Sequence, residues 1–253
     1  MAIRLDGFSS KVAIVTGSSE GIGFSIAKAL VDNGARVLLV ARREGLLRQA
    51  AESLGSNAAW ISTDLTDEGA AQKIVEKAVS RFGGIDFLVN NAGVNLLGAL
   101  GTTTLSDMRQ MMALNLIAPY LITQAAVPYL ATRPGAAILN VSTAGSRKAT
   151  PGEGFYGATK AGLNYLTSLW AVELAGQGIR VNAIAPGGTD TPQFNKAAAT
   201  IEGAREMVAN AHLIKRIARP EELIGAALLL LSPVAGSFMT GALIDVDGGY
   251  HVT

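Results

Sequence analysis

Apolar residues along this 253-residue chain fall in short runs that alternate with longer stretches of helical periodicity. Runs such as Val37 to Val40 are apolar at every position, which is typical of a strand buried on both faces of a parallel sheet. The stretches between them repeat apolar residues at helical spacing. The alternation predicts an α/β fold, a doubly wound parallel sheet of seven strands with helices on both faces. The predicted strands are 12–16, 37–40, 59–63, 87–90, 137–141, 180–184 and 243–246, and the predicted helices are 21–33, 44–54, 67–82, 105–131, 155–176 and 221–231.

This pattern continues without a Pro/Ser-rich linker, a break in composition or an internal repeat, so we expect residues 1–253 to form a single domain. The least regular part, 187–220, mixes Gly, Thr and Pro with short helical patterns and is predicted to be a mobile substrate loop. Ligands of doubly wound sheets gather at the carboxyl ends of the strands. We therefore expect the functional site at that edge.

Composition and charge narrow the class of protein. Apolar residues make up 49% of the chain, enough for a large core, and a net charge of +1 without basic runs argues against nucleic-acid binding. There are no cysteines, and His212 and His251 lie far apart in the sequence, so no metal site is predicted. The first residues lack an apolar signal core, and the apolar runs fall short of a membrane span. We expect a cytoplasmic protein without membrane contact.

A glycine-rich sequence at 16–23, Thr-Gly-Ser-Ser-Glu-Gly-Ile-Gly, follows the first predicted strand and leads into the first helix. Its glycines allow a tight turn and a close approach to a pyrophosphate, which then lies at the positive end of the helix. After the second strand, where an acid would hold the ribose of NAD, the chain has Arg42 and Arg43. Arg42 is placed to contact a 2′-phosphate, which favours NADP(H) over NAD(H). Glu20 argues mildly against this preference because it adds negative charge nearby.

Tyr156 and Lys160 lie four residues apart in a predicted helix, so their side chains share one helix face. A free tyrosine hydroxyl has a pKa of about 10, too high for efficient proton exchange near neutral pH. A neighbouring ammonium stabilises the phenolate and lowers that pKa. The pair therefore predicts a general acid/base. By itself the spacing also describes a surface tyrosine beside a solvated lysine, and the rest of the chain has to decide.

Short motifs along the chain, in this order, together resemble the short-chain dehydrogenase/reductase family. The resemblance covers nearly the whole chain and in general appearance is nearest to the 3-oxoacyl-carrier-protein reductase type. It implies a Rossmann-type sheet and an NAD(P)-dependent enzyme that interconverts a carbonyl and an alcohol, commonly as a homotetramer. The motifs are the glycine loop at 16–23, Asp64, Asn90-Asn91-Ala92-Gly93, Asn115, the Ser142 region, Tyr156-x-x-x-Lys160, Pro186-Gly187 and Asp247-Gly248-Gly249.

The resemblance assigns catalytic roles to four residues: Asn115, Ser142, Tyr156 and Lys160. Tyr156 would be the general acid during reduction, Lys160 would lower its pKa and bind the nicotinamide ribose, and Ser142 would hold the carbonyl oxygen. Asn115 would position a water in a proton relay to Lys160, unless it is a buried, satisfied core amide. The implied cofactor-binding residues are Gly17, Ser19, Gly21, Ile22, Gly23, Arg42, Asp64, Leu65, Asn91, Ala92, Gly93, Tyr156, Lys160, Pro186, Gly187, Thr189 and Thr191.

The position of the serine is ambiguous. Counting back thirteen residues from Tyr156, the family's commonest separation, reaches Thr143. The end of the predicted strand 137–141 and the pattern Ser-x-x-Gly point instead to Ser142, which we prefer. Thr143 carries an equivalent hydroxyl and remains the alternative.

The leading hypothesis is an NADPH-dependent carbonyl reductase acting on a small molecule, with alcohol oxidation as the reverse reaction. Substrate selection is expected in 94–100, 144–155 and 188–215, where apolar side chains indicate a hydrophobic substrate, unless they serve only loop packing. One rival is a dinucleotide-binding regulator without turnover, and another is a structural assembly protein. The helices 105–131 and 155–176 and the segment 238–252 are expected to form the interface of a homotetramer or homodimer. The apolar residues are Leu96, Leu97, Phe155, Phe194 and Met207.

Overall fold

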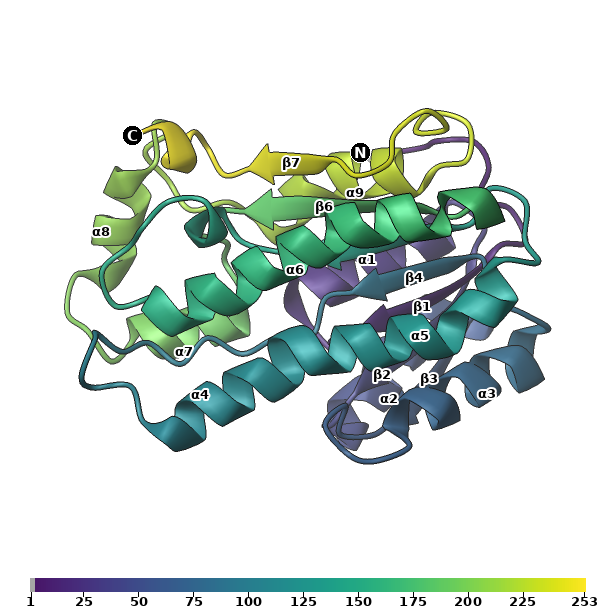
Figure 1. The fold of residues 1–253 in the computed structure, drawn as a ribbon, viewed down its shortest axis with the longest axis horizontal. Helices are drawn as coiled ribbons and strands as arrows, with labels where there is room; N and C mark the ends of the chain where they lie inside the picture. Colours follow the sequence, from purple (N-terminus) through teal and green to yellow (C-terminus); the bar gives the residue numbers. More distant parts are fainter. Residues whose placement is uncertain (1–2) are drawn as a thin grey trace.

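The computed structural model describes residues 3–253 and places seven strands in one parallel sheet (Figure 1). The strands are β1 Val12–Thr16, β2 Arg36–Ala41, β3 Ala58–Ser62, β4 Phe87–Asn90, β5 Ala137–Val141, β6 Arg180–Pro186 and β7 Leu243–Val246. Their order is β3-β2-β1-β4-β5-β6-β7, so the winding reverses between β1 and β4. At the centre, Ile14 lies opposite Leu38 on one side and Leu88 on the other. The predicted fold class is confirmed.

Alternate residues of the strands feed two hydrophobic clusters, one on each face of the sheet. In β1, Ala13 and Val15 belong to the first cluster, and Val12 and Ile14 belong to the second. Strands of this kind are continuously apolar because both faces are covered by helices. The first cluster contains residues of α1 Gly21–Asp32, α2 Glu44–Leu54 and α9 Ile224–Leu231, and the second contains residues of α3 Ala70–Phe82, α5 Ala118–Leu130 and α6 Gly154–Leu174.

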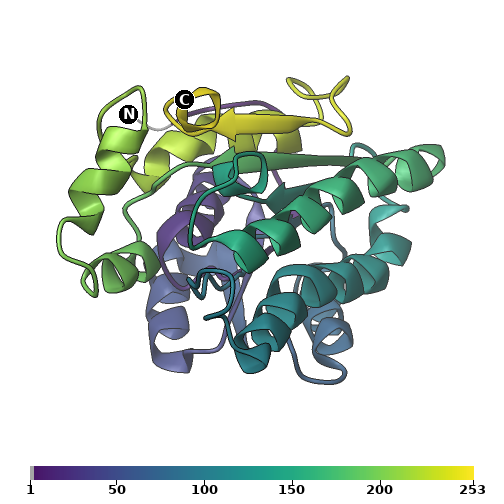
Figure 2. The same ribbon diagram turned by 60° about the vertical axis from the view of Figure 1, so that its left-hand side comes forward.

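The carboxyl ends of the strands point to the side of the molecule where α7 (Pro192–Ala198) and α8 (Ala204–Ala211) lie, on the left of Figure 1. Figure 2 shows the same two helices standing beyond the sheet, beside the C-terminus. They occupy the segment 187–220, which the sequence predicted as an irregular loop with short helical patterns. Each helix is short: α7 has seven residues and α8 has eight.

The predicted helix 105–131 contains a change of helix type. It consists of α4 (Leu105–Met112), a π-helical turn (Ala113–Ile117) and α5, in which the Ala118 N–H donates to the Ala113 carbonyl five residues back. A π turn shifts the side chains that follow it around the helix axis, and such turns are frequent at functional sites. Asn115 lies in this turn and is fully buried.

The same stretch, Leu105–Leu130, is the one helical segment among the described residues that is long and apolar enough by composition to cross a membrane. The prediction that all apolar runs fall short of a span is wrong on that criterion, because α4, the π turn and α5 are continuous. Its buried residues, such as Ile122 and Ala126, pack in the second cluster, as in the core helix of a globular protein.

Two predicted helix starts are also shifted. The helix expected from 67 begins at Ala70, because Asp64 and Thr66 form a turn after β3, closed by Asp67 N–H donating to the Asp64 carbonyl. The helix expected at 221–231 begins with a 3-10 turn (Pro220–Leu223) before α9. A proline at the first helical position favours such a start because its missing N–H needs no partner.

Candidate active site

Thr16 and Asn91 join the loops after β1 and β4 at the reversal point of the sheet. The Thr16 hydroxyl accepts hydrogen bonds from the backbone N–H groups of Asn91 and Ala92, each at 3.0 Å, and donates to the Val89 carbonyl at 3.2 Å. The Asn91 amide Nδ2 donates to the carbonyls of Thr16 and Gly17 at 2.8 and 3.1 Å. The predicted cofactor residues of these two loops are thus brought together.

The glycines of the first loop are required by this contact. A Cβ at Gly17 would lie 2.8 Å from the Asn91 Nδ2, and one at Gly23 would overlap the same atom. Gly17 and Gly21 also have positive φ angles of 64° and 60°, which side chains of L-residues rarely adopt. The loop after β1 is therefore held close to the backbone of its neighbour and tightly turned.

The N-terminus of α1 is open to an anion. Its N-cap residue, Glu20, makes no side-chain capping hydrogen bond, and no acidic residue occupies the first turn. The N–H groups at Gly21 and Ile22 start the helix, and half-buried Ser19 precedes them. Free N–H groups at a positive helix end suit a pyrophosphate.

Ser18 was not singled out from the sequence, and it fixes this loop from the other side. Its hydroxyl donates to the Val15 carbonyl at 2.7 Å and accepts from the Val40 N–H at 3.0 Å. The side chain is fully buried. Both hydrogen-bond partners of Ser18 are backbone groups of strands, so no other side chain in the sequence indicates this role. The one signal is the presence of a serine inside the glycine motif.

Four charged side chains pair at the ends of β2 and β3. Arg42 Nη1 lies 3.4 Å from Asp64 Oδ2, and Arg43 Nη2 lies 2.6 Å from Glu20 Oε1. Burial alone would raise the pKa of Asp64, but hydrogen bonds from Thr66 and the charge of Arg42 outweigh it, so this pKa lies below its ordinary value. The next residue, Leu65, is buried.

The loop after β4 runs along the π turn and Lys160. Asn115 Oδ1 accepts from the Val94 N–H at 2.8 Å, and its Nδ2 donates to the Val94 carbonyl at 2.9 Å and to the Thr159 hydroxyl at 3.1 Å. A Cβ at Gly93 would lie 3.2 Å from both Asn115 Oδ1 and Lys160 Nζ. The side chain of Asn115 therefore has protein partners for both its oxygen and its nitrogen and positions the loop.

Lys160 points under the end of β5. Its Nζ donates to the Val141 carbonyl at 2.9 Å, and the residue is only 3% exposed. Burial lowers the pKa of Lys160 from its ordinary value of 10.5 to about 8.

Tyr156 does not have the lowered pKa that the sequence predicted. Burial raises its pKa, and the negative charge of Glu153 raises it further, while a hydrogen bond from the Thr143 side chain acts in the opposite direction. Lys160 is not among the causes, and its ammonium donates to the Val141 carbonyl. The phenol therefore keeps its proton at neutral pH.

The two alternative hydroxyls after β5 face different surroundings. The Ser142 hydroxyl is buried, lies 3.3 Å from the Ser146 hydroxyl and donates weakly to the Lys160 carbonyl at 3.5 Å. Thr143 lies close enough to Tyr156 for its side chain to lower the pKa of the phenol. Ser142 therefore stays a candidate for holding the carbonyl oxygen, and its neighbour Thr143 is a second.

The segment after β6 closes the site opposite the glycine loop. The Thr189 hydroxyl donates to the Gly187 carbonyl at 3.0 Å, and the Thr191 hydroxyl caps α7 by accepting from the Phe194 N–H at 3.1 Å. A Cβ at Gly21 would lie 3.2 Å from the Thr191 methyl group. Pro186 ends β6 at this point.

His212 was not predicted as a site residue, yet it holds this segment. Its Nε2 accepts from the Gly188 N–H at 3.0 Å, so its Nδ1 carries the proton and donates to the Val208 carbonyl at 2.6 Å. The ring is buried and packs on Tyr250 with centroids 5.4 Å apart. In the sequence, nothing around His212 indicates that its ring binds the backbone of Gly188.

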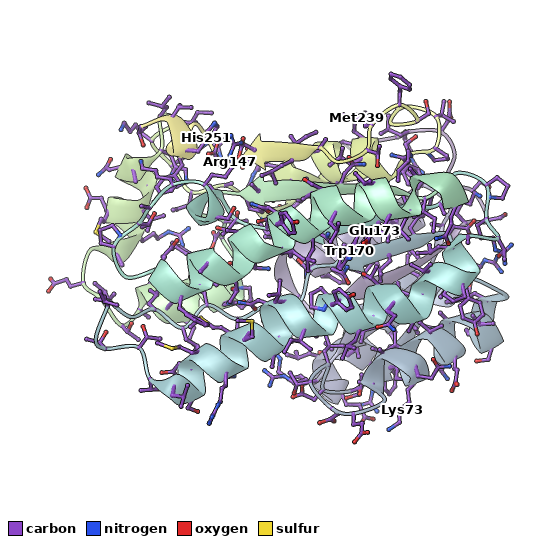
Figure 3. The ribbon with its side chains drawn as sticks, in the orientation of Figure 1. Lys73, Arg147, Trp170, Glu173, Met239 and His251 are labelled. Atoms are coloured by element: carbon purple, nitrogen blue, oxygen red, sulfur yellow. The ribbon has the colours of Figure 1, made fainter. Side chains whose placement is uncertain are left out.

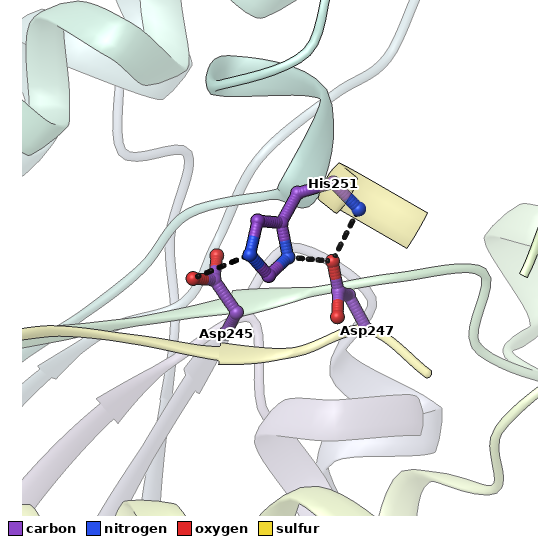
Figure 4. A group of neighbouring side chains, drawn as sticks. All are labelled: Asp245, Asp247 and His251. Carbon is purple, nitrogen blue, oxygen red and sulfur yellow. Dashed lines mark hydrogen bonds and ion pairs between the residues drawn. The ribbon is translucent and has the colours of Figure 1, made fainter. Parts of the chain in front are cut away.

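A second unpredicted group anchors the C-terminal segment. Asp245, Asp247 and His251 lie with their ligand atoms within 4.8 Å of one another (Figure 4). His251 Nδ1 is 2.7 Å from Asp247 Oδ2, and Arg147, beside His251 in Figure 3, pairs with Asp245. Although His251 is far from His212 in the sequence, it lies next to two acidic side chains, and Arg147 offsets the charge of one of them, Asp245.

A glycine loop at the reversal point of a doubly wound sheet, with a Tyr–Lys pair on a helix of the same sheet, is typical of a nicotinamide-dinucleotide oxidoreductase. The chain belongs to the short-chain dehydrogenase/reductase family, because a family model described as Enoyl-(Acyl carrier protein) reductase matches residues 17–251 and the relatives below match nearly the full length. The family resemblance is confirmed, and so is the class of enzyme, an NAD(P)-dependent oxidoreductase acting on CH–OH or carbonyl groups.

Relatives share the whole length of the chain. The 3-oxoacyl-[acyl-carrier-protein] reductase of Thermotoga maritima is 36% identical over 250 residues, covering 98% of this chain and 99% of that protein. The cis-4-hydroxycyclohexanecarboxylate dehydrogenase of Sinomonas cyclohexanicum is 36% identical over 248 residues, covering 97% and 98%. A crystal structure of 3-ketoacyl-(acyl-carrier-protein) reductase from Brucella melitensis complexed with NADH has a TM-score of 0.90 at 31% identity, covering 97% of this chain and 100% of that one.

The buried charge of Lys160 predicts a pH dependence of stability. The folded pKa of about 8 lies below the ordinary 10.5, so between these pH values the unfolded chain binds more protons and the free energy of unfolding rises with pH. Lys160→Met lacks this rise. The free energy of unfolding of wild type should therefore increase by about 3 kcal/mol relative to that of the variant across this pH range. Urea unfolding at several pH values measures the difference.

The control is Lys73→Met, an exposed lysine on α3, whose removal should leave the pH dependence of the free energy of unfolding unchanged. If the difference in free energy of unfolding between wild type and Lys160→Met does not change with pH, the lowered pKa of Lys160 is contradicted.

Proposed function

We propose that the chain is an NADP(H)-dependent reductase that interconverts a ketone and a secondary alcohol, with Tyr156 as the general acid/base. The observation that carries this proposal is the position of Lys160, one helical turn after Tyr156 on α6: its buried Nζ bonds to the Val141 carbonyl at the end of β5 and faces Gly93. A phenol beside a buried ammonium, with the Thr143 side chain close enough to affect its pKa, can bind and protonate one oxygen atom.

The residues at this edge fit a nicotinamide dinucleotide. The α1 N-terminus has no side-chain cap and no acidic residue in its first turn, and the missing Cβ of Gly93 leaves space directly beside Lys160 Nζ. When bound, the cofactor would supply the hydride for the carbonyl carbon. The residues that would hold it are the glycine loop (Gly17, Ser19, Gly21, Ile22 and Gly23), Arg42, Asp64, Leu65, Asn91, Ala92, Gly93, Tyr156, Lys160, Pro186, Gly187, Thr189 and Thr191.

In reduction, the Tyr156 phenol donates its proton to the carbonyl oxygen while the Thr143 hydroxyl holds that oxygen. The raised pKa of Tyr156 suits this direction because the phenol is protonated at neutral pH. Alcohol oxidation needs the phenolate, so it should be favoured at higher pH. Lys160 stays anchored below the Val141 carbonyl, close to Gly93.

We propose that the protein acts in the cytoplasm.

The substrate is proposed to be a small ketone. The named relatives act on a 3-oxoacyl group carried by a protein and on a hydroxycyclohexanecarboxylate, which share only the carbonyl or alcohol centre. In this chain the apolar side chains of Leu97 and Met207 are largely exposed beyond that centre, at 49% and 63%. They favour a substrate with an apolar body.

Tyr156→Phe tests the reaction. The variant keeps the ring and loses the proton donor, so ketone reduction should fall roughly 10²–10⁴-fold while NADPH still raises the melting temperature. Oxidation of NADPH with a panel of activated ketones measures the first effect, and thermal unfolding measures the second.

The same assay identifies the assisting hydroxyl. Thr143→Val should lower kcat by roughly 10², whereas Ser142→Ala should change it only a few-fold because the Ser142 hydroxyl contacts Ser146 and a backbone carbonyl. The reverse order would restore Ser142 as the oxygen-binding residue. Wild type that binds NADPH but turns over no ketone would indicate a dinucleotide-binding regulator, and wild type whose melting temperature NADPH does not raise would indicate a structural protein.

The preference for NADP(H) rests on Arg42. Its guanidinium is 62% exposed at the end of β2 and has only a long contact to Asp64, so it can turn to a 2′-phosphate. Arg42→Ala should raise KM for NADPH roughly 10- to 100-fold and change KM for NADH little.

Arg48→Ala is the matched control, since Arg48 is similarly exposed on α2 and pairs with Glu52. Equal effects of Arg42→Ala on both cofactors, or a wild type that prefers NADH, would contradict the preference.

We also propose that α5 and α6 form the interface of a homotetramer or homodimer. The two helices lie side by side on the near face in Figure 1, and the Tyr120 and Trp170 rings pack between them with centroids 5.8 Å apart. Large apolar side chains remain exposed on this face, which favours a covered surface. A monomeric mass in solution would contradict it. The exposed residues are Ile117, Tyr120, Leu121, Tyr165 and Val172.

A further inference from the structure

One acidic side chain at the catalytic centre has no part in the proposed proton transfer. Glu153 is the residue just before α6 and lies three positions before Tyr156. Its Oε2 lies so close over Gly145, in the turn after Thr143, that a Cβ at Gly145 would overlap it. The carboxylate is therefore near both side chains that would handle the carbonyl oxygen.

The backbone of Glu153 is fixed on both sides. Its N–H donates to the Thr150 carbonyl at 3.1 Å, and its carbonyl accepts from the Gly157 N–H at 2.7 Å. The carboxylate itself has no hydrogen-bond or ion-pair partner among residues 3–253, and it does not cap α6. Helix capping thus does not explain why an acid stands here.

The cations nearest in sequence are engaged elsewhere. Arg147 pairs with Asp245, and Lys148 Nζ donates to the Tyr250 carbonyl at 3.1 Å. Lys160 Nζ is held by the Val141 carbonyl. Burial raises the pKa of Glu153, and no nearby cation offsets it. The Glu153 carboxylate is half-buried, so its oxygens are free to accept a hydrogen bond from a ligand that reaches them.

We propose that Glu153 is a specificity-determining residue: its carboxylate accepts a hydrogen bond from a hydroxyl or ammonium group of the substrate and disfavours substrates that carry a carboxylate near the reacting carbonyl. The inference rests on the proposed function, since it places a ketone between Tyr156 and Thr143. It adds a rule about substrate charge to the proposed site. An anionic substrate group would face the Glu153 charge at short range, whereas a donor group would satisfy it.

Ring ketones that differ in one substituent test this rule. The probes are 4-aminocyclohexanone, 4-hydroxycyclohexanone, cyclohexanone and 4-oxocyclohexanecarboxylate, with kcat/KM measured near neutral pH, where the amine is protonated. Wild type should prefer the amino and hydroxy ketones to cyclohexanone, and reduce the carboxylate worst. In Glu153→Gln the preference for the amino ketone over cyclohexanone should fall roughly tenfold and the carboxylate should gain.

Two controls separate the outcomes. Glu173→Gln, an exposed acid near the other end of α6, should leave every ratio unchanged. Glu153→Ala should behave like Glu153→Gln if charge, and not the amide, is responsible. Cyclohexanone reduction that Tyr156→Phe abolishes, together with ratios that Glu153→Gln does not alter, would overturn the specificity rule alone. Wild type that reduces no ketone would overturn the proposed function together with this inference.

Discussion

The carboxyl edge of the sheet depends on the side-chain amide of Asn91. Its Nδ2 bonds to two carbonyls of the first loop and so joins the chain segments on either side of the reversal point. A Cβ at Gly17 or Gly23 would lie too close to that nitrogen, so the Asn91 side chain can take this position only because both residues are glycines. The same contact fixes where the loop after β4 begins, and two residues later Gly93 lies against Lys160 and Asn115. The cofactor loop and the catalytic helix are therefore coupled through a few backbone contacts.

Polar groups buried near this edge fall into two kinds. Asn115 and Lys160 have their hydrogen bonds supplied by neighbouring backbone and side chains, so they hold the loops in place. Tyr156 and Glu153 are different, because both are only half-buried, burial moves the pKa of both upward, and the carboxylate has no protein partner among the described residues. Polar groups inside a protein normally have hydrogen-bond partners, so side chains without one are candidates for contact with a ligand.

The sequence predicted the sheet because its signal is local: β1, β4, β5 and β7 have the predicted bounds, and the ends of the other three strands differ by two residues or fewer. The ordered motifs likewise fixed which loops meet. The π turn around Asn115 has no comparable signal, since a bond between Ala118 and Ala113 depends on tertiary packing. Distance in sequence hid other features: His212, at the end of α8, accepts a hydrogen bond from Gly188 in the loop after β6. The choice between Ser142 and Thr143 depends on the backbone path after β5, because successive side chains of an extended chain point in opposite directions.

Charge at the end of β2 shows how structure changes the weight of a sequence argument. Read alone, Glu20 opposes a 2′-phosphate near Arg42, but Glu20 is paired with Arg43 at 2.6 Å, so its charge is already compensated. The contact between Arg42 and Asp64 is longer, at 3.4 Å, and exposed ion pairs of this kind contribute about 0–1 kcal/mol. A phosphate offers Arg42 a doubly charged, bidentate partner, which is the stronger interaction. Exchange of Asp64 for a phosphate therefore costs little and leaves Asp64 bound by Thr66, so these two arginines have separable roles.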